Sequence, residues 1–596
     1  MSKSPYDSLT TGDNNIKPSS APRMHRPEAE KPIKSHMEYV EVPLEELVPG
    51  EAPKSTTQTA SQKNTTPLST PPQYSRLNIK NMSGTNSFTM PFEESLLVPD
   101  TMADMEQVLF AEGHVDLSQP LGKNYGTDDF LTGKITIFTV YRPTTGSRGY
   151  SAGAIDVVKS TIPFKTDKCW INSKGDTFTV AVSLGGLIAE MVNERKFVVR
   201  GDILIKISGV SAKELKTFKA PGDGDLIVRT SHISATELLH ETTETTEISQ
   251  EITVKEGEPA PIKILKESFD ICESHRQITS GKLVVHGVIQ SQVLYMGLDA
   301  KLACLSSKID FTQFILLKEN VDPDMIMIHF CSEDLNMTIE NRDKFLLSGN
   351  VLSHIQVYGN RQIDMVTDAY HKKNDLVYDV DTQPVNSVIG AVNGDISSRE
   401  VINLSEGDRY PETLLCGSCE IAGLDAHFEN DNSVDNNRII IEGTLPVNIL
   451  AVDESGDVFT INSQIPVRGA LSMSLTNKTS SYNESVLASP KLHMDSSIRN
   501  FWFTQINNRQ IEVNITLAVT VWALHEGEFC TLENLRFAEE SESARLASMA
   551  IYVVNYGDTL WDIAKRYKSD VDILAETNGL ARDEAPAEGT KLFISR

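Results

Sequence analysis

The chain has 596 residues, of which 40% are hydrophobic, and a formal net charge of −27 at pH 7. This length is too great for one hydrophobic core, so several domains are expected. The acidic balance argues against a nucleic-acid-binding protein, because phosphate groups are neutralised by clustered Lys and Arg.

The seven cysteines are scattered along the chain and form no disulfide framework. Cys416 and Cys419 are the closest pair, and they have no second pair and no nearby His to complete a metal site. We interpret them as incidental thiols and expect no metal or cofactor. The N-terminus lacks an apolar signal segment, and no run approaches the ~18 apolar residues of a membrane span. A cytoplasmic protein with no transmembrane segment is therefore expected.

Residues 1–90 have the composition of a disordered tail. Eleven of the 26 prolines lie within the first 75 residues, among Ser, Thr, Lys and Gln. Such a segment cannot bury enough surface to offset the entropy of the chain. Residues 37–49 interrupt it with Tyr39, Val42, Leu44 and Leu47. They form either a short segment that orders on a partner or a solvated linker, and we favour the linker.

Three anchors recur in the same order between residues 90 and 530. The first is a glycine followed by an alternating strand, at 133–141, 287–295 and 443–451. The second is an Ile-x-Phe or Ile-x-Val element, at 162–164, 309–311 and 465–467. The third is an asparagine that opens a long strand, at Asn193, Asn341 and Asn507. A repeat of this length indicates tandem globular domains rather than a solenoid.

The repeated segments have the pattern of β-strands. Residues 511–521 alternate strictly between apolar and polar, which places one face in a core and the other toward water. We therefore predict a mainly β protein with three tandem antiparallel β-domains, each a sandwich or open barrel, at 91–240, 241–390 and 391–532.

Helical spacing of Met102, Met105 and Leu109 predicts a helix over 100–109. Composition places linkers at 236–247, 386–406 and 533–550.

Residues 551–596 predict a separate small βααβ domain. An apolar strand, 551–554, leads into a turn, and a helix opens at Thr559, where Asp562 three residues on gives a start that resembles a capping box. Asp570 can cap a second helix, which ends at Gly579, a residue that tolerates the left-handed conformation of a helix C-cap. A second strand follows at 591–594.

The order Gly-Asp-Thr-Leu-Trp-x-Ile-Ala at the first helix and Asn-Gly-Leu after the second resembles a LysM domain. The resemblance implies binding of glycans built on N-acetylglucosamine in a groove between these two loops. The implied groove residues are Gly557, Asp558, Thr559 and Leu560 on one wall, and Asn578, Gly579 and Leu580 on the other.

The acidic loop 583–588 disfavours an anionic wall polymer, so a protein ligand is the competing interpretation. Trp561 lies off the apolar stripe of its helix, and it is either a protein-contact residue or packed against its own domain.

The β-repeat resembles the SPOCS domain, on the strand from Lys282 to Tyr295, the Ile-x-Phe element and the asparagine-anchored strand. Together with the terminal domain it resembles the SPOCS–LysM spore coat proteins of clostridia. This resemblance implies a non-enzymatic structural adaptor in the mother-cell cytoplasm, at the forespore or spore coat surface. Its implied partners are a coat morphogenetic ATPase, docked through the LysM domain, and other coat proteins.

The alternative function is binding of peptidoglycan or cortex glycan in the LysM groove. No P-loop, His-Glu-x-x-His or Gly-x-Ser-x-Gly motif occurs, so no catalytic residues are predicted.

Overall fold

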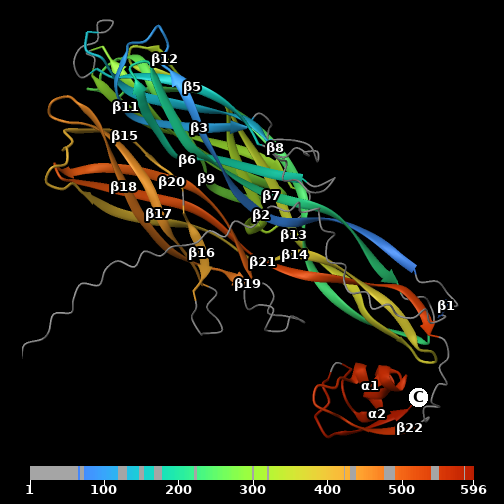
Figure 1. The fold of residues 1–596 in the computed structure, drawn as a ribbon. Coiled ribbons are helices and arrows are strands. Elements are labelled where there is room, and N and C mark those ends of the chain that lie inside the picture. Colours follow the sequence, from blue (N-terminus) through green and yellow to red (C-terminus); the bar gives the residue numbers. More distant parts are fainter. Residues whose placement is uncertain are drawn as a thin grey trace, which may run out of the picture. The chain divides into compact units, whose positions relative to one another are not determined.

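The structure is a computed structural model, and it is mainly β (Figure 1). It describes residues 65–67, 73–117, 131–146, 154–166, 177–219, 224–298, 301–317, 321–421, 423–429, 438–475, 490–538, 549–582 and 584–595. Within these ranges every strand pair is antiparallel, and both α-helices lie in the C-terminal module, residues 549–595. The predicted fold class is confirmed.

Three structural repeats follow one another, and together they form what we call the repeat body. Repeat 1 consists of β2 (Gln73–Leu97), β3 (Met105–Leu117), β4 (Thr132–Pro143), β5 (Asp156–Lys165), β6 (Thr177–Asn193) and β7 (Lys196–Lys219). Repeat 2 consists of β8 (Leu226–Thr253), β9 (Pro261–Thr279), β10 (Lys282–Gly297), β11 (Leu302–Leu316), a 3₁₀ turn (Pro323–Met325), β12 (Ile326–Asn341) and β13 (Lys344–His371). Repeat 3 consists of β14 (Leu376–Asn403), β15 (Thr413–Cys419), β16 (Asp425–Phe428), β17 (Arg438–Val452), β18 (Val458–Ser472), β19 (Ser474–Leu475), β20 (Lys491–Asn507) and β21 (Gln510–Ala538).

Each repeat is a sandwich of a small sheet and a layer of long strands, and the long-strand layers of repeats 1 and 2 join into one six-stranded sheet where Asn81 of β2 pairs with Glu237 of β8. The small sheet is a meander around a middle strand, β4, β10 or β17. The long-strand layer pairs the first and last long strands of the repeat, β2 with β7, β8 with β13 and β14 with β21. Each sandwich encloses its own apolar core, because alternate side chains of the facing strands point inward. The short strand β1 (Thr65–Pro67) pairs with the end of β21.

The repeated glycine occupies the same place in all three repeats, on the middle strand of the meander. Gly133 lies opposite Phe164 and Gly287 opposite Phe311. The absent Cβ makes room for the phenyl ring, since a Cβ on Gly287 would lie 2.1 Å from the Cζ atom of Phe311. In repeat 3 Gly443 lies opposite Val467. The first and second anchors are therefore one packing unit, and their predicted correspondence is confirmed.

The repeated asparagine makes the same turn in each repeat. The Asn193 side-chain oxygen accepts a hydrogen bond from the backbone N–H two residues on, at 2.9 Å. The corresponding bonds at Asn341 and Asn507 measure 3.1 and 2.9 Å. An asparagine that closes such a turn fixes the hairpin that leads into the long strand, β7, β13 or β21.

The long strands extend beyond their own sandwiches and pack against each other. One shared cluster contains Leu215 of repeat 1, Ile233 of repeat 2 and Phe529 of repeat 3. Beside it, the Asn81 amide donates to the backbone oxygens of Thr236 (2.9 Å) and Asn386 (2.8 Å), which joins all three repeats through buried polar groups. These contacts make one body of the three repeats.

The linkers predicted at 236–247 and 386–406 are wrong, because residues 236–247 lie within the long strand β8 and residues 386–403 within the long strand β14. The same two strands run through the predicted domain limits at 240 and 390.

The helix predicted over 100–109 is also wrong. Residues 105–109 belong to the strand β3, and a turn precedes it. Arg195, from the β6–β7 turn, donates to the Asp100 carboxylate (2.9 Å), the Asp104 carboxylate (3.1 Å) and the Met102 backbone oxygen (3.1 Å). This distant side chain holds the segment in a turn despite its helical spacing of methionines.

Residues 73–90, which composition assigned to the tail, form most of β2. The segment 37–49 lies outside the described residues. Of the predicted link 533–550, residues 533–538 belong to β21 and 549–550 to β22, while 539–548 lie outside the description.

Candidate functional site

The C-terminal module consists of β22 (Met549–Val553), α1 (Leu560–Tyr567), α2 (Val571–Asn578) and β23 (Lys591–Ser595). Its caps are those expected from the sequence. The Thr559 hydroxyl accepts from the backbone N–H of Asp562 (3.2 Å), and the Asp570 carboxylate accepts from that of Asp572 (2.9 Å). Gly579 ends α2 with a φ of 66°. Local hydrogen bonds therefore fix both helix starts of the predicted groove.

One wall of the predicted groove is the turn between β22 and α1. Gly557 is exposed, with a φ of 82°, and Leu560 is buried in the core of the module. The Asp558 carboxylate accepts from the Tyr552 hydroxyl (2.6 Å) and from the backbone N–H of Asn555 (2.9 Å). These hydrogen bonds, first that of Tyr552, lower the pKa of Asp558. Asp558 is therefore an anion that closes the turn on itself.

The other wall of the predicted groove is also held by hydrogen bonds within the module. The Asn578 amide donates to the backbone oxygens of Leu574 and Phe593, each at 2.8 Å, and its oxygen accepts from the Phe593 N–H at 2.7 Å. Leu580 packs against the core of the module, to which Leu560 also belongs. Asn578 thus joins α2 to β23, and most of its hydrogen-bonding capacity is used within the module.

Large apolar side chains, in contrast, face solvent around the module. Tyr556, next to the groove turn, is 90% exposed, and Ile573 on α2 is about half exposed. On the β22–β23 sheet Ile551 lies opposite Phe593, and both are exposed, as is Val553 two residues further along β22. This surface therefore offers apolar contact area to a ligand.

Trp561 does not face solvent, because it connects the module to the repeat body. Its indole N–H donates to Asp368 on β13 (2.7 Å), and its ring packs edge-on against Tyr370, with centroids 5.2 Å apart. One turn later on α1, Lys565 donates to the same carboxylate (2.6 Å). The Tyr378 hydroxyl of β14 is a third donor to Asp368. Trp561 is therefore a contact residue whose partner belongs to its own chain.

Further contacts extend this junction along the α1–α2 corner. The Tyr370 hydroxyl donates to the Ser569 backbone oxygen (2.6 Å), and Lys372 pairs with Asp570 (2.5 Å). Burial raises the pKa of Asp368, but the bonds from Lys565, Tyr378 and Trp561 outweigh it, so its pKa is lowered. The sequence indicated that Trp561 lay off the stripe, but nothing local pointed to Asp368, which lies far away in the sequence.

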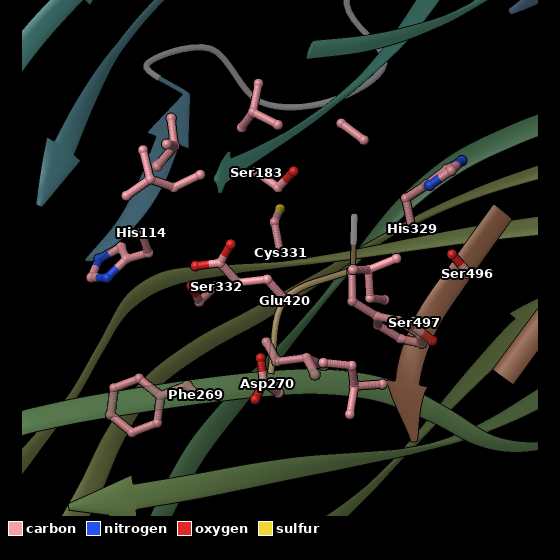
Figure 2. Close-up of a pocket in the computed structure, with 18 of the residues that line it drawn as sticks. His114, Ser183, Phe269, Asp270, His329, Cys331, Ser332, Glu420, Ser496 and Ser497 are labelled. Carbon is pink, nitrogen blue, oxygen red and sulfur yellow. The ribbon is translucent and has the colours of Figure 1, made fainter. Parts of the chain in front are cut away.

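A second candidate site is a chamber of about 2100 Å³ between the repeats. His114, Asp270 and Glu420 line it, one from each repeat (Figure 2). Each is matched with the residue three positions after the repeated glycine: His114 lies opposite Thr136, Asp270 lies opposite Gln290, and the Glu420 N–H donates to the Pro446 oxygen. The three side chains are thus corresponding positions of one repeated unit.

Burial is the main cause of the pKa shifts of the three side chains in the chamber. Burial, and then the negative charge of Glu112, raises the pKa of Asp270 to about 6. The same two causes raise the pKa of Glu420, whose rise is limited by a backbone hydrogen bond from Gly186. Burial lowers the pKa of His114. Within the described part of the chain, no group of three or more His, Cys, Asp and Glu side chains is arranged to hold a metal ion.

Among the described residues, no helix combines the length and apolarity needed to cross a membrane. Two family models match the chain. The LysM domain model matches residues 552–595, and the model described as SipL, SPOCS domain matches residues 262–341, which run from β9 to the end of β12 in repeat 2. No curated protein and no solved structure matches. The chain therefore carries a SPOCS domain and a C-terminal LysM domain, which are binding or structural modules rather than catalytic ones.

Proposed function

We propose that the protein is a non-enzymatic structural adaptor of the endospore coat. In this proposal the repeat body provides a long rigid element at the forespore surface, on the mother-cell side. The LysM module docks a coat morphogenetic ATPase, and the repeats contact other coat proteins. The association of a SPOCS domain with a LysM domain in one chain supports a coat role.

The docking role is supported by the exposed apolar surface of the LysM module. The polar side chains of the expected sugar groove, Asp558 and Asn578, are engaged in the hydrogen bonds of the module itself. Ile551, Val553 and Phe593 instead form an exposed apolar strip on the β22–β23 sheet. Desolvated apolar anchors contribute much of the affinity at protein interfaces.

Binding measurements on the full-length protein test this role. The ATPase of the same organism is titrated against the wild type and against Ile551→Arg, which introduces a charge into the strip. We expect at least a tenfold loss of affinity. The matched control is Ile506→Arg, an exposed isoleucine on β20 of the repeat body, which should bind normally. Equal affinity of wild type and Ile551→Arg would refute docking through this strip.

The second candidate function is glycan binding, which the LysM family and Tyr556 favour. The exposed Tyr556 ring stands beside Gly557, where a sugar face could stack on it. Calorimetry with N-acetylglucosamine oligomers separates the two functions. If glycan binding is the function, Tyr556→Ala removes glycan affinity while Ile551→Arg retains it. Absence of binding at millimolar oligomer would leave protein docking as the function of the module.

A further inference from the structure

The three repeats present corresponding side chains to the chamber between them. One apolar cluster contains, from each repeat, the residue seven positions after the repeated glycine: Val140, Leu294 and Leu450. His114, Asp270 and Glu420 are matched with positions four residues earlier on the same middle strands. Residues an even number of positions apart lie on one face of a strand. The cluster and the chamber therefore lie against the same face of the three meanders.

The wall of the chamber carries more acidic than basic side chains. Among the described residues, eleven carboxylates and six Lys or Arg side chains line it. All six cations pair with a carboxylate of the same wall at 3.8 Å or less, as Lys206 of repeat 1 pairs with Asp495 of repeat 3 at 3.2 Å. The basic side chains of the wall are therefore neutralised within it, and further carboxylates remain.

Asp270 and Glu420 are two of the carboxylates that remain, and both face the chamber (Figure 2). Within the part of the chain that the structure describes, neither forms an ion pair, and the Glu420 carboxylate accepts a hydrogen bond from the Gly186 backbone N–H. An ionised carboxyl that has lost water and gained no cation is unfavourable. A positive group that entered the chamber would relieve this cost at both positions.

The wall favours a flexible organic cation over a metal ion. Among the described residues, no three His, Cys, Asp or Glu side chains are arranged to hold a metal, and Asp270 and Glu420 come from different repeats. Apolar side chains such as Phe138 and Phe269 line the chamber between the charged ones. The volume of about 2100 Å³ exceeds the ~300–1,000 Å³ of an ordinary ligand pocket, so an extended chain has room. Ammonium groups separated by methylene groups match this alternation of charged and apolar wall.

We propose that the chamber binds a linear polyamine such as spermidine, with one ammonium group paired to Asp270 and another to Glu420. Alkyl amines are protonated at pH 7, as the Lys side chain is. The methylene groups between them would lie against the apolar part of the wall. His114, at the third corresponding position, does not oppose the ligand, because burial lowers its pKa and keeps it neutral. A bound polyamine would connect repeats 2 and 3 across the chamber and stabilise the repeat body.

Calorimetry on the full-length protein tests the proposal. Spermidine is titrated at about 0.15 M salt, where attraction to the exposed acidic surface is largely screened. We expect saturable binding that is about tenfold or more weaker in the double variant Asp270→Asn/Glu420→Gln, because two charge-assisted contacts are lost. The matched control is Asp364→Asn/Glu256→Gln, which removes two exposed carboxylates outside the chamber and should bind as the wild type does. Equal affinity of the two double variants, or no saturable binding to the wild type, would overturn the proposal.

Magnesium titrated under the same conditions separates a built site from general attraction to negative charge. Spermidine should bind the wild type more tightly than magnesium does, since the carboxylates do not converge on one point. Magnesium affinity equal to that of spermidine, with the same loss in the chamber variant, would assign the charge to a metal instead and overturn the proposal.

Melting temperatures separate loss of the ligand from damage to the fold. Without spermidine, the chamber variant should melt no lower than the wild type, because the substitutions preserve shape and remove buried charge. Spermidine should raise the melting temperature of the wild type and of the control, and leave that of the chamber variant unchanged. A chamber variant that melts well below the wild type without ligand would show that these carboxylates already have partners, which contradicts the proposal.

Proton release identifies the contact with Asp270. Glu112 of β3, Lys266 of its own strand and Cys419 of β15 face this carboxyl, and burial with the charge of Glu112 raises its pKa to about 6. A bound ammonium favours the ionised form, so binding at about pH 6 should release protons. Calorimetry in two buffers of different ionisation enthalpy measures the release, which should disappear in Asp270→Asn. Undiminished release by that variant would place the ligand elsewhere.

Discussion

The repeat body and the LysM module both enclose apolar cores, but the residues whose contacts form them are separated by very different distances along the chain. In repeat 3 the strand β14 pairs with β21, so that Ile402 lies opposite Ile511. In the LysM module the bonds that set the helices connect residues two to five positions apart. Damage to the body should therefore spread through paired strands, whereas damage to the module should stay local.

Within the body, repeats 2 and 3 fill the space over their common glycine differently. Phe311 covers Gly287, while Val467 is too small to cover Gly443. In repeat 3 the connection before β16 moves in, and the backbone of Gly423 and Leu424 occupies the space. The same strand order is thus compatible with a side chain or with a loop at this position.

Phe311→Ala should cause the largest loss of stability. Phe311 is buried and packs edge-on against Phe330, and truncating a buried Phe costs about 3–5 kcal/mol. Val467→Ala should cost less, on the order of 2 kcal/mol, because fewer atoms leave the core. Hydrogen exchange of β10 and β17 measures each loss. Equal losses would contradict the different packing of the two repeats.

Substituting each glycine by alanine should destabilise repeat 3 more than repeat 2, which is the opposite order. At Gly443 a Cβ would lie 2.4 Å from the backbone oxygen of Gly423, which cannot rotate away. At Gly287 the obstacle is the side-chain ring of Phe311. We expect Gly443→Ala to lose more stability than Gly287→Ala, both within about 1–3 kcal/mol. Denaturant midpoints for the two variants provide the comparison, and a larger loss for Gly287→Ala would contradict it.

Asp368→Asn breaks the junction between the body and the module while preserving shape. Lys565 loses its anionic partner, and hydrogen bonds to charged groups contribute about 1.5–3 kcal/mol. Faster hydrogen exchange should appear in α1, with β4, β10 and β17 unchanged. Asp364→Asn, an exposed position on the same strand, is the matched control and should behave as wild type. Unaltered exchange in α1 would show that the junction adds nothing to the stability of the module.

The same junction predicts a dependence on pH. The folded pKa of Asp368 is lowered, so its contribution is fully present above the unfolded pKa of about 3.9 and is lost as pH falls through the folded value. Asp570, which pairs with Lys372, shifts in the same direction. Protection of the α1 amides from exchange, relative to their intrinsic rate at each pH, should therefore fall as the pH drops below about 4. This acid step should be smaller in Asp368→Asn, and a step of undiminished size would assign it to other groups.

The two regions also differed in how far their sequence determined their structure. Thr559, Asp570 and Gly579 were predictable because a cap depends on a few neighbouring residues. Thr236 was assigned to a linker, yet it is fully buried, and its hydroxyl accepts from the Val388 N–H of repeat 3 (2.6 Å). A Thr- and Glu-rich composition cannot reveal a partner that lies about 150 residues away, and the same holds for the contact of Trp561 with Asp368.

Thr559→Ala should have the smallest effect and should be confined to the module. The variant leaves the Asp562 N–H without its partner at the start of α1, and loss of such a cap costs about 1 kcal/mol. Thr559→Ser keeps the hydroxyl and should restore most of the loss. Because the cap is local, exchange should accelerate in α1 and leave β13 unchanged. If β13 loosened as well, the junction at Asp368 would couple the module to the body, and the separation of local from long-range stability would fail.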